Sequence, residues 1–186
     1  SGAGKSTLGL AAMGYSQPGC RIKGGEINFD GVNLVKLSEA KMRRYWGNRM
    51  TYVAQSAAAS FNPAHRLIAQ TTAAKLRFAN LSKEEAYADA RQLYGALNLP
   101  DPGSIGERYP HQVSGGQLQR VMTAMAISPR PDLIIFDEPT TALDVTTQVE
   151  VLSAMRRIVE DFNTAAIYIT HDLAVVAQMA DFIKVL

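Results

Sequence analysis

The sequence predicts an α/β fold with a parallel β-sheet at its core. Residues 133–136 (LIIF) and 165–169 (AAIYI) are short apolar runs that indicate buried strands, and the first is typical of a parallel sheet. Asp137 and Glu138 directly follow the first run. Because ligands of parallel sheets bind beyond the carboxyl ends of the strands, these carboxylates mark a candidate site, one suited to a metal and the other to a water. A glycine-rich segment at residues 1–7 supports the same fold class.

This segment is the second half of a P-loop, G-x-x-x-x-G-K-[ST]. Backbone N–H groups of such a loop, together with the N-terminus of the following helix, bind phosphate oxygens. The lysine pairs with the β- and γ-phosphates, and the first hydroxyl can bind Mg²⁺. We therefore expect nucleotide phosphates at Ser1, Gly2, Ala3, Gly4, Lys5, Ser6 and Thr7, with Ser6 also binding Mg²⁺.

The P-loop pattern is incomplete at its start. Its first glycine would lie two positions before Ser1, and the chain does not begin with Met. The strand that feeds the loop, which is central in P-loop folds, would also precede Ser1. We therefore expect the N-terminal strand or strands to be missing from the printed sequence, which we interpret as a fragment truncated at both ends.

A second glycine-rich segment precedes a helical pattern. Ser114-Gly115-Gly116-Gln117 comes before apolar residues that share one helical face, Leu118, Val121, Met122 and Met125. Glycines let a backbone approach a ligand closely, and a helix N-terminus favours an anion. The segment is therefore a second candidate for anion binding.

Between these two segments the pattern changes from strand to helix. Residues 50–53 (MTYV) indicate a strand that leads to Gln55, and the following residues have helical periodicity. Ser82 and Glu85 predict a capping box at a helix start, and residues 98–103, with two prolines, predict the end of that helix. This region is therefore expected to be a helical insertion.

The last part of the chain predicts a long helix and two strands. Thr147 and Glu150 suggest a second capping box, and the apolar stripe over residues 151–162 indicates a helix face that packs against the core. Residues 165–169 and 181–186 indicate strands.

Composition excludes several classes of protein. With 186 residues, 47% of them hydrophobic and 19% charged, the chain has the composition of one globular domain. A net charge of +2 gives no reason to expect nucleic-acid binding. The lone Cys20 excludes a disulfide within the printed chain. No apolar run approaches the roughly 20 residues that span a bilayer, so we expect any membrane role to depend on a partner.

Three motifs together resemble those of ATP-binding cassette (ABC) ATPases. Residues 114–117 (SGGQ) resemble the signature, residues 133–138 (LIIFDE) the Walker B motif, and residues 141–144 (TALD) the D-loop. The resemblance implies a RecA-like P-loop NTPase core with an inserted α-helical subdomain that carries the signature. It implies a single domain over residues 1–186, with the core at 1–55 and 116–186 and the helical subdomain at about 56–115.

The resemblance also implies residue roles. ATP would lie between the P-loop and the signature of a second cassette, which pairs head to tail in a homo- or heterodimer. Glu138 would polarise the attacking water, and His171 and Gln55, the switch histidine and Q-loop glutamine, would position it. Mg²⁺ would be held by Ser6, by Gln55 and, directly or through water, by Asp137. Nucleotide contacts would also come from Ser114, Gly115, Gly116, Gln117 and, through the dimer interface, Asp144.

Two less specific motifs narrow the resemblance to a subgroup of the family. Residues 59–63 (ASFNP) and 107–112 (ERYPHQ) look like ATP-binding subunits of oligopeptide, dipeptide and nickel importers, and glutathione, opine and metallophore importers share such segments. Val113 and Leu118 depart from the usual pattern of this subgroup. The implied partners are transmembrane permease subunits and an extracytoplasmic solute-binding protein. The implied location is peripheral, at the cytoplasmic face of the membrane.

Two other functions share these motifs. A soluble ABC ATPase that moves no solute, such as a component of a phosphonate-degrading complex or a translation-linked factor, would carry the same ATP motifs. A non-hydrolysing regulatory cassette is a further alternative. Intact Glu138, Ser114 and His171 argue against the regulatory cassette, because degenerate sites usually lose one of these residues.

Overall fold

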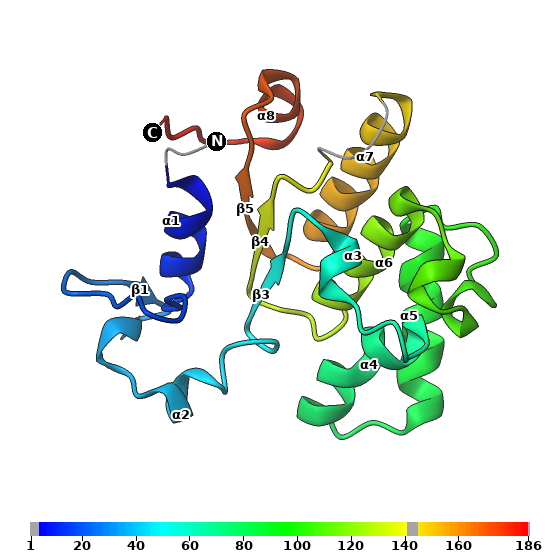
Figure 1. Cartoon of the computed structure of the whole chain (residues 1–186), viewed down its shortest axis with the longest axis horizontal. Helices are drawn as coiled ribbons and strands as arrows, with labels where there is room; N and C mark the ends of the chain where they lie inside the picture. The colour runs from blue at the N-terminus through cyan, green and yellow to red at the C-terminus, as the bar shows by residue number, and fades with distance from the viewer. Residues whose placement is uncertain (1–3, 141–144, 186) are drawn as a thin grey trace.

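The computed structural model describes residues 4–140 and 145–185 (Figure 1). Four predicted site residues, Ser1, Gly2, Ala3 and Asp144, therefore lie outside the described residues. The predicted D-loop, residues 141–144, lies outside them as a whole.

A parallel sheet forms the centre of the structure. In the described residues its strands are β3 (Met50–Val53), β4 (Leu133–Asp137) and β5 (Ala165–Ile169), in the order β3-β4-β5. These strands confirm the predictions at 50–53, 133–136 and 165–169. The register pairs Val53 with Phe136 and Phe136 with Tyr168. All three carboxyl ends therefore lie at one edge of the sheet, uppermost in Figure 1.

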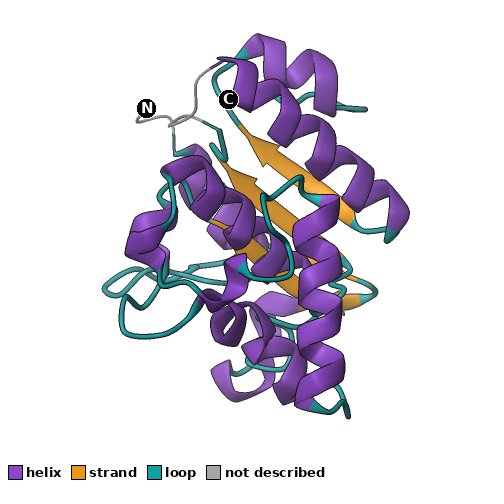
Figure 2. Cartoon of the chain, turned by 90° about the vertical axis from the view of Figure 1, so that its right-hand side faces the viewer, coloured by secondary structure: helices purple, strands orange, loops and turns teal. Residues whose placement is uncertain are grey.

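Helices cover both faces of this sheet (Figures 1 and 2). Helix α1 (Lys5–Ala12) packs against β4 and β5 on one face, while α6 (Gly115–Ile127) and α7 (Val145–Asp161) lie on the other. The alternation of β4 explains the two layers: Ile135 joins the core on the α1 side, whereas Ile134 and Phe136 join the core on the α6 and α7 side.

A group of helices lies beside the sheet and corresponds to the predicted insertion. Its members are α3 (Ala57–Ser60), α4 (Leu67–Phe78) and α5 (Lys83–Ala96), followed by the short 3-10 helices η2 (Ile105–Glu107) and η3 (Pro110–Gln112). The predicted capping box of Ser82 and Glu85 begins α5. Its predicted apolar face is buried, with Ala86, Ala90, Leu93 and Leu97 at most 2% exposed. The boundaries at about residues 56 and 115 stay a prediction.

Smaller elements complete the described chain. A hairpin of β1 (Asn28–Phe29) and β2 (Val32–Asn33) leads to η1 (Leu34–Lys36) and α2 (Glu39–Met42), and α8 (Leu173–Met179) follows β5.

Three expectations about the last third of the chain are wrong. Residues 181–185 form no strand, because a strand is held by a hydrogen-bonded neighbour and these residues have none among the described ones. Helix α7 begins at Val145, so Thr147 lies within the helix and does not precede it. Strand β5 is only partly buried, with Ile167 39% exposed, because residues of β5, including Ile167, line a cavity beside α1.

Candidate functional site

The start of α1 is built to receive an anion. Gly4 lies just before the helix in the left-handed conformation, at φ 77°, which glycine adopts without steric cost. Lys5 is the first helical residue, Ser6 follows it, and none of the described residues in the first turn is acidic. Free N–H groups and the positive end of the helix dipole therefore meet a lysine at this point. This part of the P-loop fits a phosphate group.

Asp137 ends β4 on the face that α1 covers. Residues 135 and 137 share a face of the strand, and Ile135 belongs to the core on the α1 side. The Asp137 side chain is only 6% exposed. Its Oδ2 accepts a 2.5 Å hydrogen bond from the hydroxyl of Tyr52. Burial, and then this hydrogen bond, raise the pKa of Tyr52 above its ordinary value, so the tyrosine is the donor.

The other oxygen of Asp137 fits a cation. Oδ1 is buried and has no hydrogen-bond partner among the described residues, and an unpaired buried carboxylate oxygen is costly unless a cation or donor meets it. No group of three or more His, Cys, Asp or Glu in the described ranges could hold a metal alone. Mg²⁺ suits such a site, because it is commonly bound by one or two carboxylates together with substrate phosphates.

Glu138 follows β4 and contacts residues at the carboxyl ends of β3 and β5. Its Oε2 accepts a 3.2 Å hydrogen bond from Nε2 of Gln55, which follows β3. Its Oε1 lies 3.1 Å from Nδ1 of His171, which follows β5. The backbone N–H of Glu138 donates to the carbonyl of Ile169 at 2.8 Å. The predicted catalytic residues Gln55, Glu138 and His171 therefore meet at the carboxyl edge of the sheet.

This arrangement is suited to general-base chemistry. The Glu138 side chain is 12% exposed, whereas His171 is 65% exposed, so the glutamate is sheltered and the histidine faces outward. Glu138 has a positive φ of 47°, a sparsely populated conformation for a non-glycine residue that is often found at functional sites. A carboxylate can only accept, so the proton in the contact with His171 belongs to Nδ1. A glutamate held in this way can accept a proton from a bound water.

The predicted anion-binding residues 114–117 form a helix start on a different element. Ser114 Oγ accepts from the N–H of Gln117 at 3.3 Å, and Gln117 Oε1 accepts from the N–H of Ser114 at 3.0 Å. This reciprocal capping box begins α6, and the sequence analysis did not identify it. Ser114 and Gly115 are exposed, so this helix N-terminus is open to a ligand.

Two polar contacts at the site escaped sequence analysis. One is the bond from Tyr52 to Asp137. The other joins Gln148 Nε2 of α7 to Asp172 Oδ2 at 3.1 Å, beside His171. Asp172 also caps α8 by accepting from the N–H of Ala174, and this bond is the main reason that its pKa is lowered. Both contacts join residues far apart in sequence, so no local pattern could reveal them.

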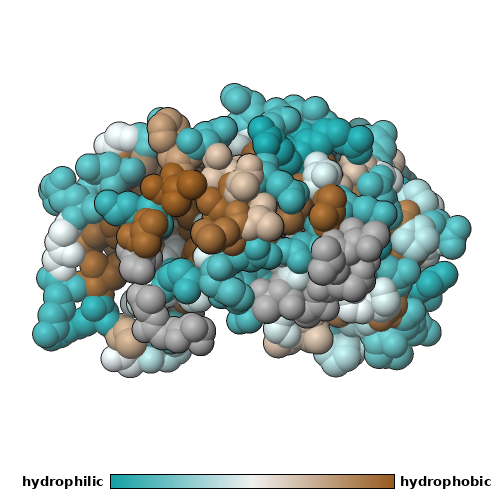
Figure 3. Space-filling view, turned by 90° about the horizontal axis from the view of Figure 1, so that it is seen from above, coloured by the Kyte–Doolittle hydropathy of each residue, from teal (hydrophilic) through white to brown (hydrophobic). Residues whose placement is uncertain are grey.

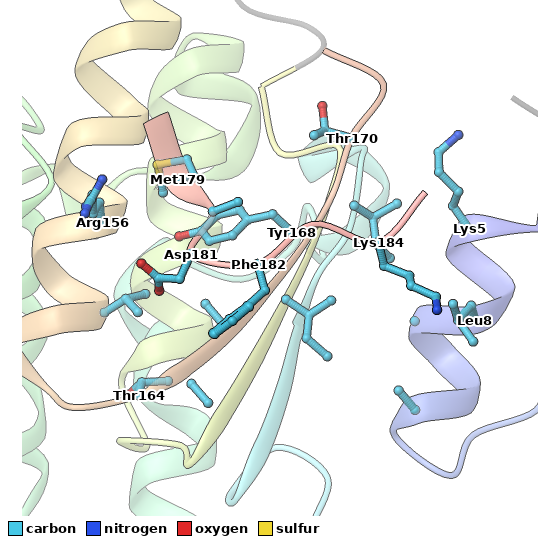
Figure 4. A pocket seen from close by; sticks show the side chains of 18 of the residues that line it. Lys5, Leu8, Arg156, Thr164, Tyr168, Thr170, Met179, Asp181, Phe182 and Lys184 are labelled. Carbon is cyan, nitrogen blue, oxygen red and sulfur yellow. The ribbon is translucent and has the colours of Figure 1, made fainter. Parts of the chain in front are cut away.

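A cavity of about 890 Å³ lies between α1, β5 and the segment that follows α8 (Figure 4). Lys5 and Thr170 lie at one end of it, and Tyr168 lines its wall, but Gln55, Asp137, Glu138 and His171 do not line it. The cavity follows the side of β5 that pairs with no other strand among the described residues. The edge of such a strand has free N–H and C=O groups that can pair with another strand.

The surface at the carboxyl edge of the sheet is mixed. Figure 3 views this side of the molecule and shows hydrophobic residues beside hydrophilic ones. Leu173, at the start of α8, and Phe182 are 81% and 96% exposed. No helix within the described ranges is long and apolar enough to cross a membrane.

Comparison with known proteins gives one consistent result. A family model described as ABC transporter matches residues 1–141. The oligopeptide transport ATP-binding protein OppD of Escherichia coli is 39% identical over 186 residues, covering all of this chain and 55% of OppD. The dipeptide transport ATP-binding protein DppD of Bacillus subtilis is 38% identical, covering all of this chain and 56% of DppD. The glutathione import ATP-binding protein GsiA of Salmonella typhimurium is 39% identical, covering all of this chain and 31% of GsiA.

The chain therefore spans about half the length of the two peptide-transport relatives. Among solved structures, dimeric MJ0796, a bacterial ABC transporter cassette, superposes with a TM-score of 0.82 at 24% identity, over 96% of this chain and 75% of the other. A post-hydrolysis dimer of MJ0796 bound to ADP and Pi gives a TM-score of 0.81 at 23% identity, over 95% and 73% of the two chains. This likeness establishes the fold of an ABC cassette.

Proposed function

Because the chain belongs to the ABC transporter family, we propose that it binds and hydrolyses ATP to power an importer of peptides or similar small solutes. The observation that carries this proposal is the position of Glu138. It directly follows Asp137 and is held on one oxygen by Gln55 and on the other by His171. A carboxylate for Mg²⁺ next to a residue that positions the attacking water is the arrangement that ATP hydrolysis by P-loop proteins uses.

Nucleotide binding is assigned to the start of α1. Lys5 would pair with the β- and γ-phosphates, and the N–H groups of the helix start would donate to phosphate oxygens. Residues 1–3 are proposed to extend this cradle. Ser6 and Asp137, with Gln55, would hold Mg²⁺, which when bound neutralises charge on the phosphate oxygens.

Hydrolysis is assigned to the three strand ends. Glu138 would accept a proton from the attacking water as the water approaches the γ-phosphate. Gln55 and His171 would fix the glutamate and orient the water, because each already holds one oxygen of the carboxylate. The His171 side chain is exposed, so a substrate could reach it.

A second cassette is proposed to complete each site. Residues 114–117 begin an exposed helix on a different element from Glu138, which suits contact with a nucleotide bound to another copy. Dimeric MJ0796 has the same fold. Asp144 would lie at the interface of this head-to-tail dimer, which can be homo- or heterodimeric.

The relatives support the importer role. OppD and DppD are named for oligopeptide and dipeptide transport, and GsiA for glutathione import. By this likeness, the chain would act at the cytoplasmic face of the membrane with permease subunits and an extracytoplasmic solute-binding protein.

One purification tests both parts of the proposal. The full-length protein is tagged in its native host, membranes are solubilised gently, and co-purifying proteins are identified while ATP hydrolysis is measured. We expect multi-span permease subunits together with ATPase activity that Glu138→Gln removes. Recovery with soluble enzymes or ribosomes only would overturn the importer role but keep the ATPase. A protein that binds no ATP in either fraction would overturn both.

A further inference from the structure

Tyr52 and Asp137 are placed together by strand register. In the parallel pair of β3 and β4, Tyr52 lies opposite Ile135, and Asp137 lies two residues farther along β4. Side chains at positions i and i+2 of a strand share a face, so Tyr52 and Asp137 project from the same side of the sheet. Diagonal neighbours of this kind lie within reach of an aromatic side chain. The tyrosine ring spans this diagonal, and its hydroxyl meets Asp137 Oδ2 at 2.5 Å.

The two oxygens of Asp137 have different surroundings. Oδ2 is held by Tyr52, whereas Oδ1 is buried without a partner among the described residues. A carboxylate anchored through one oxygen cannot rotate freely, so the direction of the other oxygen is set. That free oxygen lies on the side of the sheet covered by α1, the helix that begins with Lys5 and Ser6.

We propose that Tyr52 is a positioning residue that orients Asp137 toward the Mg²⁺ of the bound nucleotide. This inference rests on the proposed function, because it assigns a cation to Asp137. Tyr52 touches neither the nucleotide nor the reacting water in this scheme. By holding Oδ2, it would leave Oδ1 as the oxygen of Asp137 that can meet the cation, directly or through water.

A matched control exists on β5, the other strand that pairs with β4. Tyr168 of β5 lines the cavity of Figure 4. Its hydroxyl is buried and has no hydrogen-bond partner among the described residues. Its ring stacks on Phe136, with centroids 4.7 Å apart, and this contact survives the loss of the hydroxyl. Tyr52→Phe and Tyr168→Phe therefore each remove one hydroxyl oxygen atom, and only the first releases Asp137.

The test measures cation affinity, not turnover. Full-length parent, Tyr52→Phe, Tyr168→Phe and Asp137→Asn proteins are saturated with a non-hydrolysable ATP analogue and titrated with Mn²⁺, with free Mn²⁺ followed by electron paramagnetic resonance. Affinity for the analogue is measured separately in EDTA. We expect Tyr52→Phe to weaken Mn²⁺ binding by about 10- to 100-fold, the usual cost of losing a group that orients a metal ligand. Its affinity for the analogue in EDTA should stay unchanged, and Tyr168→Phe should match the parent in both measurements.

The outcomes separate the two proposals. Parental Mn²⁺ affinity in Tyr52→Phe would overturn the role of Tyr52 while Asp137→Asn still reports on the cation site. An equal loss in Tyr52→Phe and Tyr168→Phe would also overturn it, because the effect would then not depend on the hydrogen bond to Asp137. A parent protein that binds no nucleotide would overturn the proposed function, and the role of Tyr52 with it.

Discussion

Nδ1 of His171 lies 3.1 Å from Oε1 of Glu138, although the two residues are 33 positions apart. The contact exists because β4 and β5 run parallel in register and end together, with Asp137 paired with Ile169. Gln55 holds the second oxygen of the same carboxylate from the end of β3. The glutamate is thus oriented by contacts within the chain, which lowers the cost of reorganisation during a reaction.

Replacement of Glu138 tests the general base directly. Glu138→Gln keeps the size of the side chain but cannot accept the proton, so ATP hydrolysis should fall by about 10²- to 10⁴-fold. Phosphate release by the full-length protein gives the rate, and equilibrium binding of ATP provides the control, which should stay close to the parent value. Parental turnover in Glu138→Gln would show that another group acts as the base.

The contact between His171 and Glu138 predicts non-additive losses. If the histidine acts through the glutamate, His171→Ala should slow hydrolysis in the parent but add little to the loss in Glu138→Gln. Phosphate release from the two single variants and the double variant gives the coupling between the residues. Losses that multiply in the double variant would mean that the two residues act independently.

Lys5 is expected to contribute to nucleotide affinity. Lys5→Ala removes a charged hydrogen-bond donor from the start of α1 and should weaken ATP binding by about 10- to 100-fold. Lys41→Ala is the control, because Lys41 is an exposed lysine on the short helix α2. Binding of a fluorescent ATP analogue to the full-length protein gives both affinities. Equal affinities in the two variants would contradict the P-loop assignment.

The capping boxes of Ser82 and Ser114 allow the effect of a serine on helix stability to be separated from its effect on ATP hydrolysis. Ser114 begins α6 and Ser82 begins α5 with the same reciprocal hydrogen bonds. Replacing either serine with alanine should cost about 1 kcal/mol of unfolding free energy, as measured by urea denaturation. Only Ser114→Ala should also slow ATP hydrolysis, because only Ser114 is assigned to the nucleotide. Equal activity in the two variants would mean that Ser114 serves the helix alone.

A packing test concerns the helical group beside the sheet. A Cβ atom at Gly106 would lie 2.8 Å from Cβ of Ile68 and 2.9 Å from Cε2 of Tyr94, whereas nothing lies within 4 Å of one at Gly103. Gly106→Ala should therefore lower stability by about 1–3 kcal/mol through overpacking. Gly103→Ala, three residues earlier, should change it much less. Urea denaturation gives the free energy of unfolding of both variants. Equal values would show that Ile68 and Tyr94 can move aside.

Local patterns were sufficient to predict the strands of the sheet and the start of one helix. The apolar runs at 50–53, 133–136 and 165–169 became the strands of the sheet, and the capping box of Ser82 and Glu85 begins a helix where expected. Such features depend on residues within a few positions of each other, so the sequence alone is sufficient to predict them. The residue types at the candidate site, including Gln55, Glu138 and His171, were also evident from motifs.

Tertiary structure alone decided which of these residues touch. Tyr52 and Asp137 are 85 positions apart in the sequence, and their hydrogen bond depends on the register between β3 and β4. The hydrogen bond from Gln148 to Asp172 depends on how α7 packs against α8. The same reason explains the expectation that failed at residues 181–185. Their composition favours a strand, but a strand is stable only when a neighbour satisfies its backbone hydrogen bonds. Pairing between distant segments is a property of the folded chain, and no local pattern encodes it.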